Sequence, residues 1–260
     1  MSDTVQASRG FRFPAEVILW AVRWYLQFPI SYRDLERMLA DRGVEVDHTT
    51  MYRWVQHFAP ELEKRMRRHL RPCRGPWYVD ETYIRVSGEW RYLYRAVDGT
   101  GQTIDFLLSA KRDKRAAKRF FKRALGREHT RNPREVVTDR LKSYPGALRE
   151  MKQKGELWRF ARHRRGRWLN NRVEQDHRRI KRLTRPMLGF QGFWTAKRTL
   201  AGIEAMAMLA KGQVRAVPRG DMPAQRSFVQ QIFGLRLEQV EAVERRALYR
   251  RCNRSGRCWS

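Results

Sequence analysis

Cysteine is scarce in this chain of 260 residues. Three occur, at Cys73, Cys252 and Cys258, and no two of them form a CxxC pair. An odd count without paired spacing disfavours a disulfide scaffold or a structural zinc site, and we expect a reducing cytoplasm. No run of 18 apolar residues exists, which excludes a membrane-spanning helix. Residues 1–10 are polar, so we expect no secretory signal peptide.

Acidic residues are the second scarce group. Asp and Glu number 27 against 56 Lys and Arg, which gives a formal net charge of +29. A folded chain this basic repels itself unless polyanions neutralise it, so we expect a nucleic-acid partner. An anionic membrane is the weaker alternative, because no amphipathic helix with a clean apolar face stands out. Hydrophobic residues still make up 42% of the chain, which is enough for a folded core.

After a flexible N-terminus at 1–13, residues 14–58 predict a helix-turn-helix DNA-binding domain. Apolar residues recur at helical spacing after Pro14, and Ser31 begins a second helix that stops at Gly43. Asp47 or Thr49 can cap a third helix. The N-terminal residues of that helix would enter the major groove of DNA. The expected DNA contacts are His48, Thr49, Thr50, Tyr52 and Arg53. A three-helix bundle without a DNA role is the alternative.

A charged linker at 59–75, which we expect to be helical and which ends in a Pro/Gly cluster, leads to a region of different character at 76–213. Its pattern predicts an α/β domain with a mixed sheet and helices on both faces. The expected strands are 77–86, 90–97, 103–109, 135–138 and, as a fifth candidate, 156–161; the expected helices are 111–125, 144–152, 168–187 and 193–211. Residues 214–260 form a C-terminal segment with a short helix at 227–235 and an Arg-rich tail.

Three carboxylates in this region are candidate metal ligands. Asp80 lies inside the first apolar strand, where an unpaired charge is costly. Asp139 directly follows the fourth strand, and ligands bind at strand C-termini in open α/β sheets. Glu174 lies on a basic helix, where it flanks the apolar stripe. Converging oxygen donors in a basic protein suggest Mg²⁺ or Mn²⁺, and two such ions are the usual apparatus for displacement at phosphorus.

The helix that carries Glu174 offers more than a carboxylate. His177 and Lys181 follow at i+3 and i+7, so they share its face. One helix edge therefore presents a carboxylate, an imidazole and an ammonium group to a crevice beside the sheet.

Each carboxylate also has a structural interpretation. An Asp after a strand is often a helix cap, and a Glu on an Arg-rich helix often pairs at i,i+4, here with Arg178. Glu81 on the opposite strand face is a rival to Asp80, and Asp176 in the apolar stripe is a rival to Glu174. The three acids indicate a metal site only if the fold brings them together.

The spacing and local motifs resemble the DDE triad of insertion-sequence transposases, specifically the IS6 family. Asp80, Asp139 and Glu174 are separated by 58 and 34 residues, and Lys181 comes seven after the Glu. The motifs are WYVDETY at 77–83, VTDRLKSY at 137–144 and NNRVEQDHRRIK at 170–181. The resemblance runs from about residue 13 to 235.

The resemblance implies an RNase H-like catalytic domain at 76–213. Asp80, Asp139 and Glu174 would be catalytic and would ligate two Mg²⁺ or Mn²⁺ ions, while Lys181 would contact substrate phosphate, with His177 and Arg178 also facing DNA. The implied reaction is cleavage at terminal inverted repeats of double-stranded DNA. The freed 3′-hydroxyl then attacks target DNA, and replicative transposition gives a cointegrate.

Two DNA ends must be held together, so we expect a homodimer or higher oligomer. We expect no membrane partner. A protein of this kind would work in the bacterial cytoplasm, on the nucleoid when it is bound to DNA. Two alternatives stay open. One is a helix-turn-helix regulator or inactivated transposase without catalysis, and the other is a nuclease that acts on RNA.

Overall fold

The structure, a computed structural model, describes residues 12–139, 141–166 and 171–235, without the side chains of residues 171 and 172. The predicted flexible N-terminus up to residue 11 and the predicted Arg-rich tail from residue 236 lie outside this part. The helices are α2 (Ala15–Gln27), α3 (Tyr32–Ala40), α4 (His48–Met66), η1 (Arg67–His69), α5 (Lys114–Leu125), α6 (Ser143–Gln153), α7 (Asn171–Thr184), η3 (Arg185–Met187), α8 (Phe193–Ala210) and α9 (Met222–Ile232). The strands are β1 (Trp77–Val86), β2 (Glu89–Val97), β3 (Thr103–Ser109), β4 (Glu135–Thr138) and β5 (Arg162–Arg165).

The five strands form one mixed sheet in the order β3-β2-β1-β4-β5. β1, β2 and β3 are antiparallel neighbours, whereas β4 runs parallel to β1 and β5 runs parallel to β4. This is the RNase H-like mixed sheet expected from the sequence. β4 pairs with β1 only as far as Val79, so β1 no longer pairs with β4 from Asp80 onward.

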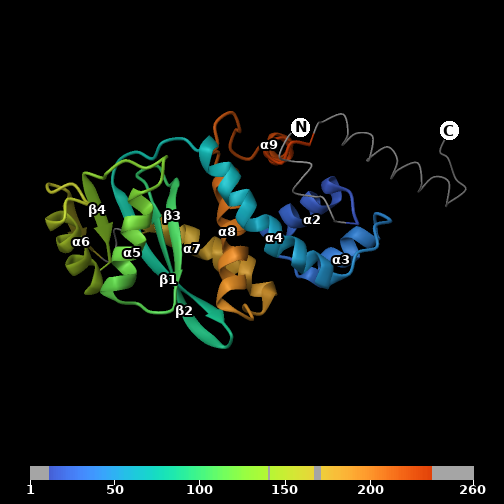
Figure 1. The fold of residues 1–260 in the computed structure, drawn as a ribbon, viewed down its shortest axis with the longest axis horizontal. Helices are drawn as coiled ribbons and strands as arrows, with labels where there is room; N and C mark the ends of the chain where they lie inside the picture. The colour runs from blue at the N-terminus through green and yellow to red at the C-terminus, as the bar shows by residue number, and fades with distance from the viewer. Residues whose placement is uncertain (1–11, 140, 167–170, 236–260) are drawn as a thin grey trace, which may run out of the picture.

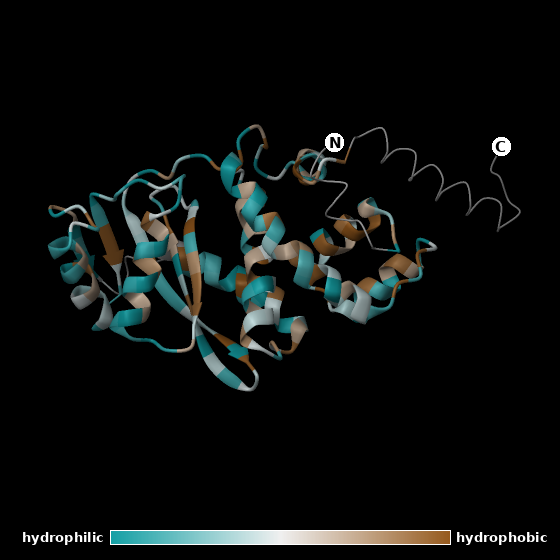
Figure 2. Cartoon of the chain, viewed as in Figure 1, coloured by the Kyte–Doolittle hydropathy of each residue, from teal (hydrophilic) through white to brown (hydrophobic). Residues whose placement is uncertain are grey.

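Helices cover both faces of the sheet (Figure 1). On one face, Val79 and Tyr94 pack with apolar residues of α5 and α6, such as Phe120. On the other face, Ile84 packs into a larger cluster with α7, α8 and the N-terminal helices. Figure 2 shows hydrophilic and hydrophobic segments alternating along α4 and α5, as helices with one buried face require. No described helix is both long and apolar enough to cross a membrane.

The three N-terminal helices follow the predicted layout. Ser31 accepts a hydrogen bond from the backbone N–H of Asp34, whose carboxylate accepts one from the backbone of Ser31, a complete capping box. Asp47, rather than Thr49, is the N-cap of α4. Gly43 has a φ of +72°, which suits the turn after α3.

The predicted domain boundary at residue 58 lies inside a helix. α4 continues to Met66 through Pro60 and η1 follows, so the helical linker expected from the sequence is continuous with the third helix. Its extension packs along α8, and Figure 1 shows this pair of helices between the sheet and the α2–α3 region. One hydrophobic cluster includes residues of α2, α4, α8 and the sheet. The N-terminal helices therefore share a core with one face of the sheet.

Two further predictions need correction. The fifth strand is Arg162–Arg165 and not 156–161, because an edge strand of this polar sequence has no apolar alternation to reveal it. The C-terminal helix starts at Met222, five residues before the predicted start, since Asp221 caps it and Pro223 stands in its first turn. α7 ends at Thr184 and is followed by the short η3. Residues 168–170 of that predicted helix lie outside the described part.

Candidate active site

Asp80 and Asp139 meet where β1 and β4 separate. Val79 and Thr138 are the last paired residues of these parallel strands, and one acid follows each of them. Carboxylate oxygens of Asp80, Glu81 and Asp139 all lie within 4.8 Å of one another. The strand register thus brings together two of the three predicted acids, together with the rival Glu81. Such a cluster of oxygen donors can hold a divalent cation.

Asp139 is not a helix cap, although one of its oxygens has a local partner. Oδ1 accepts a hydrogen bond from the backbone N–H of Leu141 at 3.0 Å, whereas α6 begins only at Ser143, after Lys142. Oδ2 lies 3.7 Å from the guanidinium of Arg112. The second oxygen therefore faces the acidic cluster and a cation.

Glu81 is tightly held by two neighbours. Its buried carboxylate accepts hydrogen bonds from the Tyr144 hydroxyl and from Arg112. Arg112 also donates to the Tyr83 hydroxyl at 3.1 Å. These contacts fix Glu81 toward α6, on the sheet face opposite α7, and they bring a guanidinium to the edge of the cluster. Nothing in the local sequence around Arg112 distinguishes it from the other arginines, so its role is visible only in the fold.

Burial raises the pKa of Asp80 to about 7, and the neighbouring Glu81 carboxylate adds to the increase. Burial likewise raises the pKa of Glu81, although the bonds from Tyr144 and Arg112 oppose that change. Both shifts have a physical cause in crowded like charges removed from water. The cluster resists full ionisation without a cation.

α7 lies against β1 beside this cluster. His177 is 6% exposed, and its Nδ1 lies 4.0 Å from Oδ2 of Asp80. Burial lowers the pKa of His177 to about 3, and the Arg95 charge acts in the same direction. The imidazole is therefore neutral at pH 7 and packs against Asp80. A neutral, buried ring carries no charge to offset a DNA phosphate, and the DNA contact of His177 stays a prediction.

Glu174 stands one helical turn before His177 on α7, and its side chain is exposed. It is not part of the 4.8 Å cluster among the described residues. No ion pair joins it to Arg178 in that same part of the chain, so the i,i+4 interpretation has no support. Arg178 and Lys181 are also exposed on α7.

Asp176, the rival to Glu174, points elsewhere. Its Oδ2 lies 3.1 Å from Nη2 of Arg95 and also pairs with Lys211. Arg95 is 1% exposed and pairs with the fully buried Glu204 of α8 at 2.7 Å. This buried network of four charges, Arg95, Asp176, Glu204 and Lys211, joins β2, α7 and α8. Arg95 inside the apolar run of β2 was a sequence signal for such pairing that the sequence analysis passed over.

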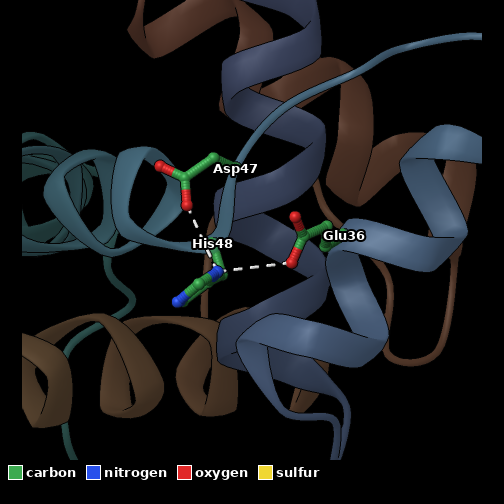
Figure 3. Close-up of side chains that lie close together, drawn as sticks. All are labelled: Glu36, Asp47 and His48. Atoms are coloured by element: carbon green, nitrogen blue, oxygen red, sulfur yellow. Dashed lines mark ion pairs between the residues drawn. The ribbon is translucent and has the colours of Figure 1, made fainter.

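At the start of α4, the predicted DNA-contacting residues differ in exposure. Thr49, Tyr52 and Arg53 are exposed, and Thr50 is half-buried. Figure 3 shows the half-buried His48 between two carboxylates, with Nδ1 3.2 Å from Asp47 and 3.4 Å from Glu36 of α3.

Asp47 in turn accepts hydrogen bonds from the backbone N–H and hydroxyl of Thr49. Glu36, Asp47 and His48 also lie within the distances of a possible metal site. Since Asp47 is already committed to capping α4, we assign this group to fixing α3 against α4.

Comparisons with known proteins identify the family of the chain. A family model described as a DDE domain matches residues 75–213. The transposase for insertion sequence-like element IS431mec of Staphylococcus aureus is 40% identical over 207 residues, which cover 79% of this chain and 89% of that protein. The transposase for insertion sequence element IS257 in transposon Tn4003, also from Staphylococcus aureus, has the same identity and coverage.

Among solved structures, the catalytic core domain of HTLV-2 integrase in complex with magnesium (trimeric form) has a TM-score of 0.40 and 16% identity. The match covers 54% of this chain and 87% of that chain. The family match spans more than half of the sequence, and the relatives are aligned over most of their length. The chain therefore belongs to the IS6 family of insertion-sequence transposases and contains their DDE domain.

Proposed function

We propose that this protein is the transposase of an insertion sequence, which cuts double-stranded DNA at the terminal inverted repeats of its element and joins the freed 3′ ends to target DNA. The observation that carries the proposal is the meeting of Asp80 and Asp139 where the pairing of β1 with β4 ends, in a chain with a net charge of +29. Replicative transposition with a cointegrate product follows from the family. With DNA as the substrate, we propose that the reaction takes place on the nucleoid in the bacterial cytoplasm.

The acidic cluster fits divalent cations. Asp80 has a raised pKa because burial and nearby carboxylates disfavour its charge, and a bound cation would remove that penalty. Oxygen ligands suit Mg²⁺ or Mn²⁺. We assign Asp80, Asp139 and Glu174 as the ligands of two ions. When bound, such ions activate an attacking hydroxyl and stabilise the departing oxygen of a phosphodiester.

Glu174 is preferred to Glu81 as the third ligand for a structural reason. Glu81 is occupied by Tyr144 and Arg112. Glu174 is exposed on α7, one turn before the histidine that lies beside Asp80. The buried network around Arg95 holds α7 on the sheet and so orients Glu174.

Other residues of the chain would hold the DNA. Lys181, seven residues after Glu174 on the same helix, is exposed and is assigned to a substrate phosphate, with Arg178 beside it. Arg112 reaches the edge of the acidic cluster and would offset phosphate charge there. Buried His177 is assigned to supporting Asp80 rather than to contacting DNA.

The N-terminal helices would select the DNA end. Thr49, Tyr52 and Arg53 are exposed at the start of α4, where a helix-turn-helix reads the major groove, and Thr50 lies between them. His48 takes part indirectly, because Glu36 and Asp47 hold it. Since two element ends must be joined to one target, we propose that at least two copies of the chain act together.

The test is a strand-transfer assay with labelled element-end DNA and Mn²⁺. Asp80→Asn and Glu174→Gln are expected to bind DNA normally and to lose joining by several orders of magnitude. Glu135→Gln is the matched control, because this carboxylate lies at the other end of β4 and pairs with Arg164. Joining that survives in either variant, or binding and joining lost together, would refute the assignment. Preferential cleavage of structured RNA would favour the RNA-nuclease alternative.

A further inference from the structure

A groove of about 790 Å³ opens between the β1–β2 hairpin and the end of α7, the elements that carry Asp80 and Glu174. Tyr83 and Trp90 of the hairpin line it together with Lys181, Arg185 and Leu188. Its volume lies in the range of about 300–1,000 Å³ that holds small organic ligands. We propose that this groove binds unpaired nucleotides of the DNA strand next to the scissile phosphate, with a base stacked on Trp90. The inference rests on the proposed function for its choice of DNA.

The groove lies along the part of β1 that no longer pairs with β4. β4 pairs with β1 only up to Val79, and Asp80 is the first residue beyond that pairing. Farther along, the same edge of β1 is bridged by Phe190, whose N–H donates to the carbonyl of Arg85 at 3.1 Å. The edge between these two points faces the groove.

The groove and the acidic cluster are built on the same two elements. Tyr83 follows Asp80 by three residues on β1, about 10 Å along a strand. Lys181 follows His177 by four residues on α7, about 6 Å along a helix. Arg112 links the two directly, because it pairs with Glu81 and donates to the Tyr83 hydroxyl. A DNA strand with a phosphate at the carboxylates would therefore continue into the groove.

Its chemistry matches single-stranded nucleic acid. Trp90 is 61% exposed and Tyr83 is 43% exposed, and their rings meet edge to face at 6.4 Å. Arg85, Lys181 and Arg185 supply positive charge, and no carboxylate occurs among the described residues that line the groove. Aromatic faces flanked by cations stack bases and hold phosphates, but in a duplex the base faces are covered by neighbouring pairs. Unpaired nucleotides fit this surface better.

Leu188 supports the same conclusion. It is 92% exposed and has a φ of +53°, a left-handed conformation that is unfavourable for leucine. The bonds of Phe190 to Arg85 and Ser87 hold the adjacent chain in place. Strain of this kind persists mainly where function requires it. An exposed apolar side chain on a fixed loop is suited to wedge between base steps and to help keep them unpaired.

The experiment compares binding of the full-length protein, with Ca²⁺ in place of a catalytic metal, to two DNA probes. One is a blunt 25-base-pair duplex, and the other is the same duplex with a four-nucleotide 3′ overhang that contains 2-aminopurine. We expect the overhang to improve affinity about tenfold, the factor given by one stacked base, and 2-aminopurine fluorescence to be quenched on binding.

Trp90→Ala is expected to remove both the preference and the quenching. Trp194→Ala is the matched control, because this tryptophan of α8 is 69% exposed and lies outside the groove. Leu188→Gly, which relieves the left-handed strain, should keep the fold and reduce the preference. Equal affinity of the wild type for both probes would overturn the inference, as would a Trp90→Ala protein that keeps the preference or instead changes its oligomeric state.

The two proposals fail in different ways. A wild-type protein that joins DNA ends with Mn²⁺ but shows no overhang preference overturns only the groove assignment. A protein that keeps the Trp90-dependent preference but joins no DNA supports the groove and overturns the transposase proposal. Asp80→Asn is expected to keep the preference, because it removes a metal ligand and leaves the groove lining intact.

Discussion

Arg95→Met tests whether the buried charge network holds α7 on the sheet. Arg95 is 1% exposed, and it is the cation that pairs with the fully buried Glu204 in the described structure. Removing one partner of a buried pair leaves an uncompensated charge and costs about 3–5 kcal/mol. Since a domain has a free energy of unfolding of about 5–15 kcal/mol, the variant should lose a fifth or more of its stability. The Asp176 carboxylate is destabilised less than that of Glu204, because Lys211 still pairs with it.

The assay is urea unfolding followed by tryptophan fluorescence, on the wild type, Arg95→Met, Glu204→Met and the double variant. Well-packed apolar residues can replace a buried ion pair at little cost. The double variant should therefore be more stable than Arg95→Met, with a coupling energy of about 2 kcal/mol or more. A loss below about 1 kcal/mol for Arg95→Met, or additive effects of the two changes, would refute this reasoning.

Three further predictions concern packing, pH and DNA. Gly202→Ala should lower the free energy of unfolding by about 1–2 kcal/mol in urea melts, because its Cβ would lie 2.6 Å from that of Ala59 and overpacking exceeds the gain in helix propensity. Gly146→Ala, which meets only a flexible lysine at 3.4 Å, should instead be neutral or stabilising.

The raised pKa of Asp80, about 7 against 3.8 when unfolded, means that ionisation between these values destabilises the metal-free fold. The Mn²⁺-induced rise in Tm should therefore grow from pH 5.5 to 7.5, and an equal rise at every pH would contradict this. Arg53→Ala should weaken element-end binding in a gel-shift assay while leaving Mn²⁺-dependent nicking of nonspecific DNA, and equal loss of both would oppose that division.

The acidic pair could be predicted because it depends on local sequence and strand order. The runs around Asp80 and Asp139 are apolar and β-branched, so both strands were visible in the sequence. Parallel pairing of the start of β1 with β4 then places Asp80 beside Asp139, which directly follows β4. For Glu174, the sequence indicated only which face of its helix it occupies. Its approach to the cluster depends on α7, whose position is set by distant residues such as Arg95.

The features that the sequence did not reveal depend on tertiary contacts. α4 runs without a break across the predicted domain boundary because α8 supplies an apolar partner for its second half, and Gly202 lets the two helices approach closely. β5 consists of Arg and His residues at a sheet edge, which no hydrophobic period can reveal. Arg112 gains its place from Glu81 and Tyr83, which are near it only in the folded chain.

The most direct measurement is the anomalous diffraction of a crystal of the protein with an element-end DNA and Mn²⁺. We expect two manganese peaks, each about 2.1 Å from carboxylate oxygens. Asp80, Asp139 and Glu174 should supply those oxygens, while Glu81 stays paired with Arg112. Manganese held by Glu81 in place of Glu174, or no manganese between Asp80 and Asp139, would contradict it.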